Sequence, residues 1–223
     1  APPTDHRGRA RNSVVQFQDN YIELYTATLP PPVTGKTAGA AGGPASFSFG
    51  RYNAQVLQRR EGVTMLAFES HDARRDLAGF AAAGLTVHGP LDFTSAPDPT
   101  GVWDQALSFS LALVTDVRTP EAVYFVCQMH LPENLWKPAL QRHANAAQRI
   151  AEVVMVAPQP AELAGLFGAL QRPEQVRSTE GTLHVATARG QVTVLTPTAF
   201  SARYGGIAPV ATGPHFAAVR LTV

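Results

Sequence analysis

The chain has 223 residues, enough for one large domain or two small ones, and 45% of them are hydrophobic against 16% that are charged. This composition is typical of a folded soluble protein and excludes an intrinsically disordered chain. Eighteen basic and 17 acidic residues leave a formal charge of +1, which gives no electrostatic reason to expect nucleic acid or a membrane surface as a partner. We therefore expect a small molecule or another protein chain.

The single cysteine, Cys127, can form neither an internal disulfide nor a cysteine-rich zinc site. A cytoplasmic location is the expectation that follows. Because Cys127 lies inside an apolar run, we expect a buried thiol and not a nucleophile. The sequence also lacks the motifs of phosphate-binding loops, serine hydrolases and zinc proteases.

The first predicted elements are a hairpin, a loop and a short helix. Alternating runs at 13–17 and 21–25 predict a β-hairpin. Residues 29–44, rich in proline and glycine, predict an exposed loop. Residues 51–60 predict a helix that ends at Gly62.

A unit of strand, helix and three strands follows, and its element order then recurs. Its predicted elements are a strand at 63–69, a helix at 72–83, and strands at 86–93, 103–115 and 122–130, with a turn at 98–101. After a predicted linker helix around 135–147, the second copy has a strand at 150–157, a helix at 160–170, a weak strand at 175–180, and a hairpin formed by 182–188 and 191–196.

Matched element order at a period of roughly 85 residues predicts an internally duplicated fold. The first hairpin would end an earlier copy, and the run at 216–223 would be the opening strand of a later one. We therefore predict one domain at 1–148 and a further module at 149–223.

Tandem β-α-β-β-β modules with a strand that reads Tyr21-Ile22-Glu23-Leu24 resemble the vicinal oxygen chelate superfamily. Longer stretches are similar to the bacterial glyoxalase-like domain proteins of that superfamily, namely 49–53 with 60–62, 125–138 and 141–145. The resemblance covers nearly the whole chain. It implies an α+β fold whose mixed sheets curl into half-barrels around a cleft, although fold alone does not fix activity.

The resemblance also implies a divalent metal, such as iron, manganese, nickel or zinc, held by residues of the opening and last strands of each module. Met65 takes the opening-strand position of the second module, and a thioether is a poor ligand for such a metal. The last strand of that module offers Gln128 or His130, which share a face by period two. In the third module Glu152 takes the opening-strand ligand position, but the last strand has Thr193 where the resemblance implies a glutamate. These positions therefore do not give a complete ligand set.

Glu23 and His130 are the candidate catalytic residues and metal ligands, and Glu152 is a third candidate ligand. Each has a structural alternative. Glu23 could lie on a solvated strand face beside Tyr21 and Tyr25, and a backbone carbonyl could satisfy His130. Glu152 could cap a strand or form an ion pair.

The candidate substrate pocket combines an aromatic wall with polar contacts. Its predicted residues are Tyr21, Gln128, Trp136, His143 and Asn145. In the alternative interpretation Trp136 clamps the connection between modules, and the polar residues cap a helix end.

Two hypotheses about function follow. The first is a protein that binds a small oxygen-rich or aromatic molecule in the half-barrel cleft, either as a metal-dependent lyase or isomerase or as a dioxygenase. The alternative is a metal-free protein that binds or sequesters such a molecule without catalysis, which Met65 favours. An exposed edge strand at the carboxyl end further predicts a homodimer.

Overall fold

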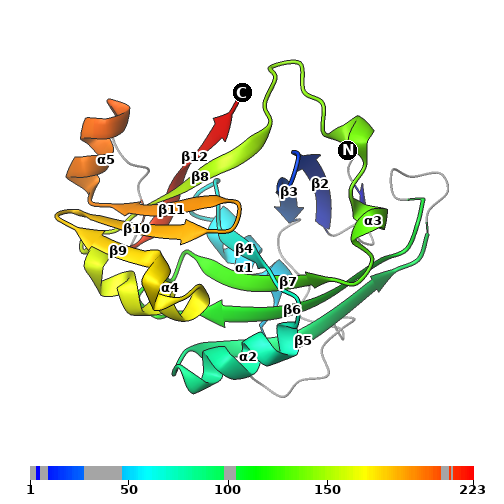
Figure 1. Ribbon diagram of the computed structural model, residues 1–223, viewed down its shortest axis with the longest axis horizontal. Helices are drawn as coiled ribbons and strands as arrows, with labels where there is room; N and C mark the ends of the chain where they lie inside the picture. The colour runs from blue at the N-terminus through cyan, green and yellow to red at the C-terminus, as the bar shows by residue number, and fades with distance from the viewer. Residues whose placement is uncertain (1–3, 6–9, 28–46, 98–103, 207–210, 212) are drawn as a thin grey trace.

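The computed structural model describes residues 4–5, 10–27, 47–97, 104–206, 211 and 213–223, which form three sheets and a few short helices (Figure 1). The first sheet contains β1 (Thr4–Asp5), β2 (Ala10–Gln16) and β3 (Tyr21–Ala27). The second contains β4 (Met65–Glu69), β5 (Thr86–Ser95), β6 (Leu107–Thr115) and β7 (Val123–Met129). The third contains β8 (Arg149–Val156), β9 (Val176–Thr179), β10 (Thr182–Thr187), β11 (Gly190–Leu195) and β12 (His215–Thr222).

The second and third sheets repeat one topology, as the sequence predicts. Their strand orders are β4-β7-β6-β5 and β8-β11-β10-β9, and in each the opening strand runs parallel to the last strand of its unit. Helix α2 (Ala73–Ala82) follows β4, whereas the 3-10 turn η2 (Pro160–Leu163) and α4 (Ala164–Leu170) follow β8. The duplicated β-α-β-β-β order and the mixed α+β fold are therefore confirmed.

Local signals explain where α2 begins and ends. The Asp72 carboxylate accepts a hydrogen bond from the Arg75 amide at 3.0 Å, which satisfies one of the free amides of the first turn. Gly84, with a φ of 80°, follows the last turn in the left-handed conformation that glycine adopts without strain. Ala73 and Phe80 are the residues that α2 buries.

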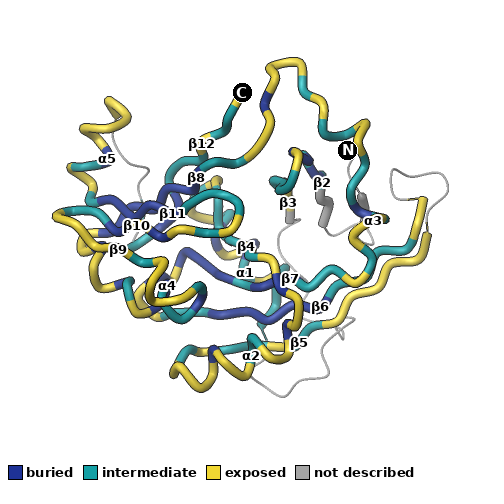
Figure 2. The backbone as a smooth tube through the Cα atoms, viewed as in Figure 1, coloured by how far each residue is buried: buried dark blue, intermediate teal, exposed yellow. Residues whose placement is uncertain are grey.

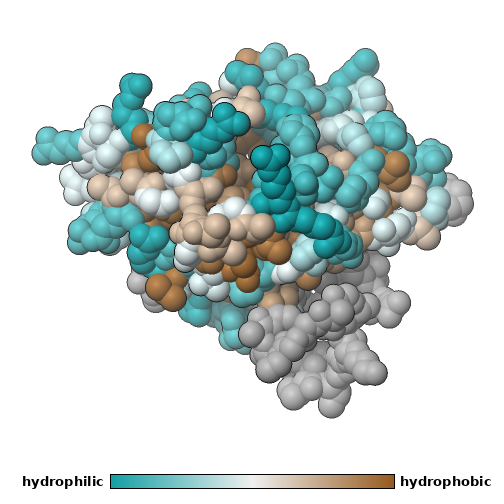
Figure 3. Space-filling view, turned by 60° about the horizontal axis from the view of Figure 1, so that its bottom comes forward, coloured by the Kyte–Doolittle hydropathy of each residue, from teal (hydrophilic) through white to brown (hydrophobic). Residues whose placement is uncertain are grey.

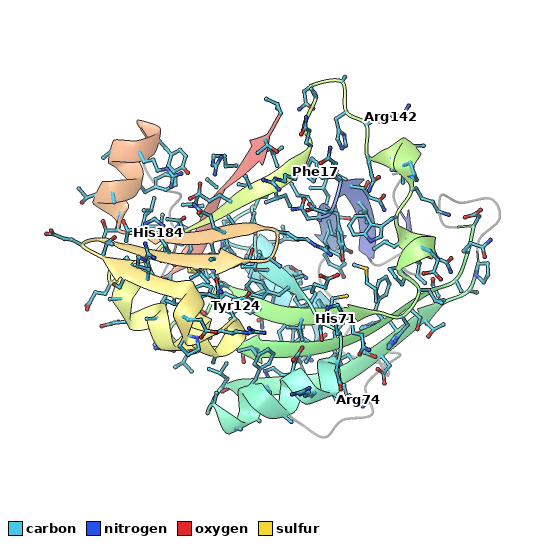
Figure 4. All side chains as sticks on the ribbon, viewed as in Figure 1. Phe17, His71, Arg74, Tyr124, Arg142 and His184 are labelled. Carbon is cyan, nitrogen blue, oxygen red and sulfur yellow. The ribbon has the colours of Figure 1, made fainter. Side chains whose placement is uncertain are left out.

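One hydrophobic core joins the two repeated units. The Tyr124 ring of β7 packs edge-on against Phe167 of α4, with centroids 5.6 Å apart, and against Phe216 of β12 at 6.0 Å. Figure 2 shows the middle strands of both sheets buried, and Tyr124 lies between them in Figure 4. The predicted boundary at 148/149 therefore falls between two sheets that share a core, and it stays a prediction.

Side-chain hydrogen bonds in both directions join the linker to the β2–β3 hairpin. The Gln16 amide, fully buried, donates to the Leu135 carbonyl at 2.6 Å and accepts from the Lys137 amide at 3.0 Å. His143 Nε2 lies 2.6 Å from the Gln16 carbonyl oxygen. Gln141 donates to the carbonyls of Phe17 and Gln18.

The hairpin turn is also tied to both large sheets. Asn20 exchanges two hydrogen bonds with the backbone of Ile150 on β8. Arg189, in the β10–β11 turn, donates from Nη1 to the Asp19 carbonyl at 2.6 Å and from Nη2 to both carboxylate oxygens of Glu69 of β4 at 2.8 Å. The hairpin is thus held in place over the second sheet.

The structure corrects three expectations about elements. The linker is not one helix but α3 (Pro132–Leu135) and the 3-10 turn η1 (Pro138–Leu140), because each proline begins a new turn and cannot continue the one before it. Helix α5 (Pro197–Tyr204), capped by Thr196 and ended by Gly205, is not predicted. Strand β12, expected as the opening strand of a later copy, instead joins the third sheet, where it is an edge strand and pairs antiparallel with β8.

Helix α1 (Phe49–Leu57) lies close to its predicted range. A further 3-10 turn, η3 (Pro173–Gln175), precedes β9. The loop predicted at 29–44 and the turn at 98–101 fall outside the described residues. Among the helices that are described, none has the length and apolar character needed to cross a membrane.

Replacing Gln16 with alanine should lower the free energy of unfolding by about 2–3 kcal/mol, because it leaves one buried and one partly buried backbone group without partners. Urea denaturation checks the loss, and hydrogen exchange should show faster exchange of the hairpin amides. The control is Gln55→Ala on the exposed side of α1. Equal stability of the two variants would contradict the role given to Gln16.

Candidate functional site

The inner face of the second sheet is apolar and faces the β2–β3 hairpin (Figure 1). We call it the apolar face. It is formed by Met65 of β4, Leu91 of β5, Phe109, Leu111 and Leu113 of β6, Val123, Phe125, Cys127 and Met129 of β7, and Phe47, Phe49 and Tyr52 around α1. The Phe49 and Phe125 rings meet edge-on with centroids 6.1 Å apart, so α1 packs onto this face.

Glu23 and Tyr21 of β3 bring polar groups to the apolar face. Burial, and to a lesser extent the negative charge of Glu23, raise the pKa of the Cys127 thiol to about 12. The pKa of Tyr21 is likewise raised, first by burial and then by Cys127 and Glu23. Both groups therefore stay protonated at neutral pH, and the carboxylate of Glu23 gives the site a negative field.

Tyr21 and Trp136, both predicted for the substrate pocket, are in contact with each other. Their rings meet edge-on with centroids 6.0 Å apart. Trp136 follows α3, directly beside the backbone groups that Gln16 binds. The placement is therefore consistent with both interpretations of Trp136, the aromatic wall of a pocket and the clamp between modules.

His143 and Asn145, predicted to line the pocket, bind the hairpin and the linker backbone. His143 binds the Gln16 carbonyl and packs on the Phe17 ring with centroids 5.2 Å apart. Asn145 accepts from the Ala147 amide at 3.2 Å. These contacts fit the structural alternative, in which the linker holds the hairpin.

Gln128 and His130 share a face, as the period-two argument predicts, but it is the face opposite the apolar one. Gln128 accepts from the Ala73 amide at 3.2 Å and donates to the His71 carbonyl at 2.9 Å, so it holds the start of α2. Both lie on the side of Ser110, whose β6 position pairs with Gln128. The sheet separates them from Glu23.

His130 ends a polar chain on that outer face. Its Nε2 lies 2.8 Å from the Ser110 hydroxyl, which donates to Asp92 at 2.6 Å. The hydrogen bond from Ser110 lowers the pKa of Asp92, and Arg74, 2.7 Å away, adds to the shift. Ser110 and Asp92 are absent from the sequence prediction because nothing local links residues from three strands.

Glu152 lies on β8 in the third sheet, whereas Glu23 lies on β3 and His130 follows β7. Glu152 is fully buried and accepts from the guanidinium groups of Arg203 and Arg220 and from Gln191 and Thr193. Of its two predicted structural alternatives, the geometry is that of an ion pair.

The donor set of this structure does not fit the divalent metal that the resemblance implies. Within the described part of the chain, no three histidine, cysteine, aspartate or glutamate side chains gather to hold an ion. Glu23, His130 and Glu152 lie apart. Around Glu23 the apolar face supplies a protonated thiol and the thioether of Met65, which are poor partners for a hard cation.

Comparisons with known proteins agree on the fold. A family model described as a glyoxalase-like domain matches residues 2–170. No curated protein matches the chain. A crystal structure of a hypothetical protein from Staphylococcus aureus aligns with a TM-score of 0.60 and 11% identity, over 84% of this chain and 72% of that chain. At this identity the likeness shows the fold alone.

Proposed function

Since the chain belongs to the glyoxalase-like domain family of the vicinal oxygen chelate superfamily, we propose that it binds a small aromatic molecule on the apolar face without a divalent metal. The observation that carries the proposal is the composition of this face. Aromatic and thioether side chains form this face, and one exposed carboxylate, Glu23, acts through its charge on Tyr21 and Cys127. A surface of this composition favours apolar contacts with a ligand over coordination of a metal ion.

The aromatic residues support a planar ligand. Phe49, Phe109, Phe125 and Met129 are partly exposed, so their rings and thioether can contact a bound molecule. Offset or edge-to-face ring contacts add about 0.5–1.5 kcal/mol each beyond the burial of apolar area. Trp136 and Tyr21 extend the same surface toward α3.

The charge at Glu23 supports selection among such ligands. Because its carboxylate raises the pKa of Tyr21, Tyr25 and Cys127, the field on this side of β3 is negative. An aromatic molecule that carries a positive or hydrogen-bond-donating group is therefore favoured over an anionic one. The protonated Cys127 and Tyr21 make covalent catalysis by either group unfavourable.

One observation favours the second candidate, a metal-dependent enzyme. Glu23 lies on the last strand of its hairpin, where the resemblance places a carboxylate ligand, and its charge acts on Cys127 of the next module. Lyase or dioxygenase activity would need further ligands beside it. The homodimer and the cytoplasmic location expected from the sequence stay predictions.

Replacing Glu23 with glutamine should weaken binding of the cationic dye acridine orange about fivefold, because an exposed charge pair contributes up to about 1 kcal/mol. Binding of the neutral dye Nile red should change less than about twofold, since its contacts are apolar. Fluorescence titration measures both, with Glu133→Gln on exposed α3 as the matched control. An equal loss for both dyes would remove the electrostatic part of the proposal.

A further inference from the structure

Arg189 lies at the point where the three sheets meet. It belongs to the turn between β10 and β11, beyond the residues that the glyoxalase-like family model matches, and Figure 1 shows this turn next to β4. Its Nη1 donates to the Asp19 carbonyl of the hairpin turn at 2.6 Å, and its Nη2 donates to both carboxylate oxygens of Glu69 at 2.8 Å. One guanidinium group therefore joins the first, second and third sheets.

The backbone of the β10–β11 turn is packed closely on β8. Gly190 has a φ of 144°, in the region that favours glycine, and a side-chain carbon at its position would lie 2.8 Å from the Ala151 carbonyl oxygen. In the same stretch of β8, Ile150 exchanges two hydrogen bonds with Asn20 of the hairpin turn. The third sheet therefore presents Arg189 from a fixed point beside the hairpin.

Glu69, the ion-pair partner of Arg189, lies at the edge of the apolar face. It ends β4 and pairs in register with Cys127 of β7, so the two side chains share one side of the sheet. Cys127 is part of the apolar face, and the charge of Glu23 acts on its thiol. The ion pair therefore lies in the same row of the sheet as the residue on which the hairpin acts.

The hairpin is held on two sides, and Arg189 acts on one of them. On the linker side, the Gln16 amide binds the linker backbone. At the turn, Arg189 binds the hairpin and β4 at once. Tyr21 and Glu23 lie on β3 directly after this turn, so a displacement of the turn also displaces these two side chains from the second sheet.

We propose that Arg189 is a positioning residue of the apolar face, which sets the spacing between the hairpin and the second sheet and so places Tyr21 and Glu23 against a bound ligand. The third unit thereby completes a binding site that the first and second sheets form. This inference rests on the proposed function, because it adds a supporting residue to the same site. A purely structural role would leave ligand affinity unchanged.

The test compares Arg189→Gln with wild type in the whole chain. Nile red should bind roughly two- to tenfold more weakly, the range that corresponds to one aromatic ring contact. The thiol of Cys127, which is buried, should react about fivefold faster with the neutral reagent N-ethylmaleimide, because the loss of a partly exposed ion pair makes the displaced hairpin about that much more populated. Urea denaturation confirms that the variant is folded.

The matched control is Arg74→Gln. It removes an exposed ion pair with Asp92 on the outer face of the second sheet, and it should leave both measurements within about twofold of wild type. Arg189→Lys keeps the charge beside Glu69 but loses the second nitrogen, so it should restore part of the affinity. Adding Glu69→Gln to Arg189→Gln should change little further, since the two residues act as one pair.

Two outcomes separate this inference from the function on which it rests. Nile red affinity and Cys127 reactivity that are the same in Arg189→Gln as in Arg74→Gln would overturn the role of Arg189 alone. A wild-type chain that does not bind Nile red would instead contradict the proposed function. The Cys127 reaction rates would still decide whether Arg189 positions the hairpin, because they need no ligand.

Discussion

Replacing Glu152 with glutamine should lower the free energy of unfolding by about 3 kcal/mol, because two guanidinium groups then lose their counter-charge at a buried position. The partial exposure of both arginines lets water compensate in part, so the loss falls at the low end for buried pairs. Chemical denaturation at pH 7 measures it, and Glu133→Gln should change stability by less than about 0.5 kcal/mol.

The same variant gives a pH dependence of defined sign. The pKa of Glu152 is about 2 in the folded state against 4.5 as its ordinary value, so its stabilisation is complete above pH 4.5. It is lost as the pH falls from there through 2. The stability difference between wild type and variant should therefore shrink across this window. A difference that is small at pH 7, or that does not change down to pH 2, would contradict the ion-pair account.

Replacing Phe167 with alanine should cost about 3–5 kcal/mol, because its ring is fully buried between the two repeated units. The loss should appear as one cooperative transition, since α4 shares its core with Tyr124 of the second sheet. Thermal denaturation followed by circular dichroism, together with hydrogen exchange of β4–β7, measures both effects.

The matched control for Phe167 is Leu24→Ala. Leu24 is 56% exposed on β3, so its loss should cost less than about 1 kcal/mol. If β4–β7 kept full protection in Phe167→Ala while the third sheet unfolded, the two units would be separate domains and the shared core would not be the stabilising feature.

Figure 3 shows the face at the bottom of Figure 1, where hydrophobic residues gather centrally within a hydrophilic surround.

Local sequence signals predict the repeat because they act within a few residues. The hairpin follows from alternation and its polar turn, and α2 follows from Asp72 and Gly84 at its ends. The linker is not one helix because Pro138 interrupts it, and its backbone groups instead bind the hairpin more than 100 positions earlier in the chain, as the Leu135 carbonyl binds Gln16. No periodicity encodes such contacts.

The candidate site is only partly predictable for a similar reason. In β7, Tyr124 and Val126 are buried on one face and Val123 and Cys127 on the other. A strand buried on both faces gives no alternation that identifies the inner one. The two-residue period of a strand therefore predicts that Gln128 and His130 share a face. It does not predict that Cys127 is the residue that faces Glu23.

The partners of Glu152 could not be predicted from the sequence either. Its apolar surroundings on β8 indicate a buried carboxylate, which needs a counter-charge. Arg203 on α5 and Arg220 on β12 supply it from 51 and 68 positions away in the chain. The spacing carries no sign of the pairing, and only the β8–β12 register brings Arg220 beside Glu152.

The most direct test of the proposed function is a Nile red titration of protein stripped of metal with a chelator, repeated after addition of zinc, manganese, nickel or iron. We expect saturable binding with the same dissociation constant, within about twofold, with and without metal, because the contacts are apolar. Binding that appears only after metal is added, and that Glu23→Gln abolishes, would contradict the metal-free account and support the enzyme.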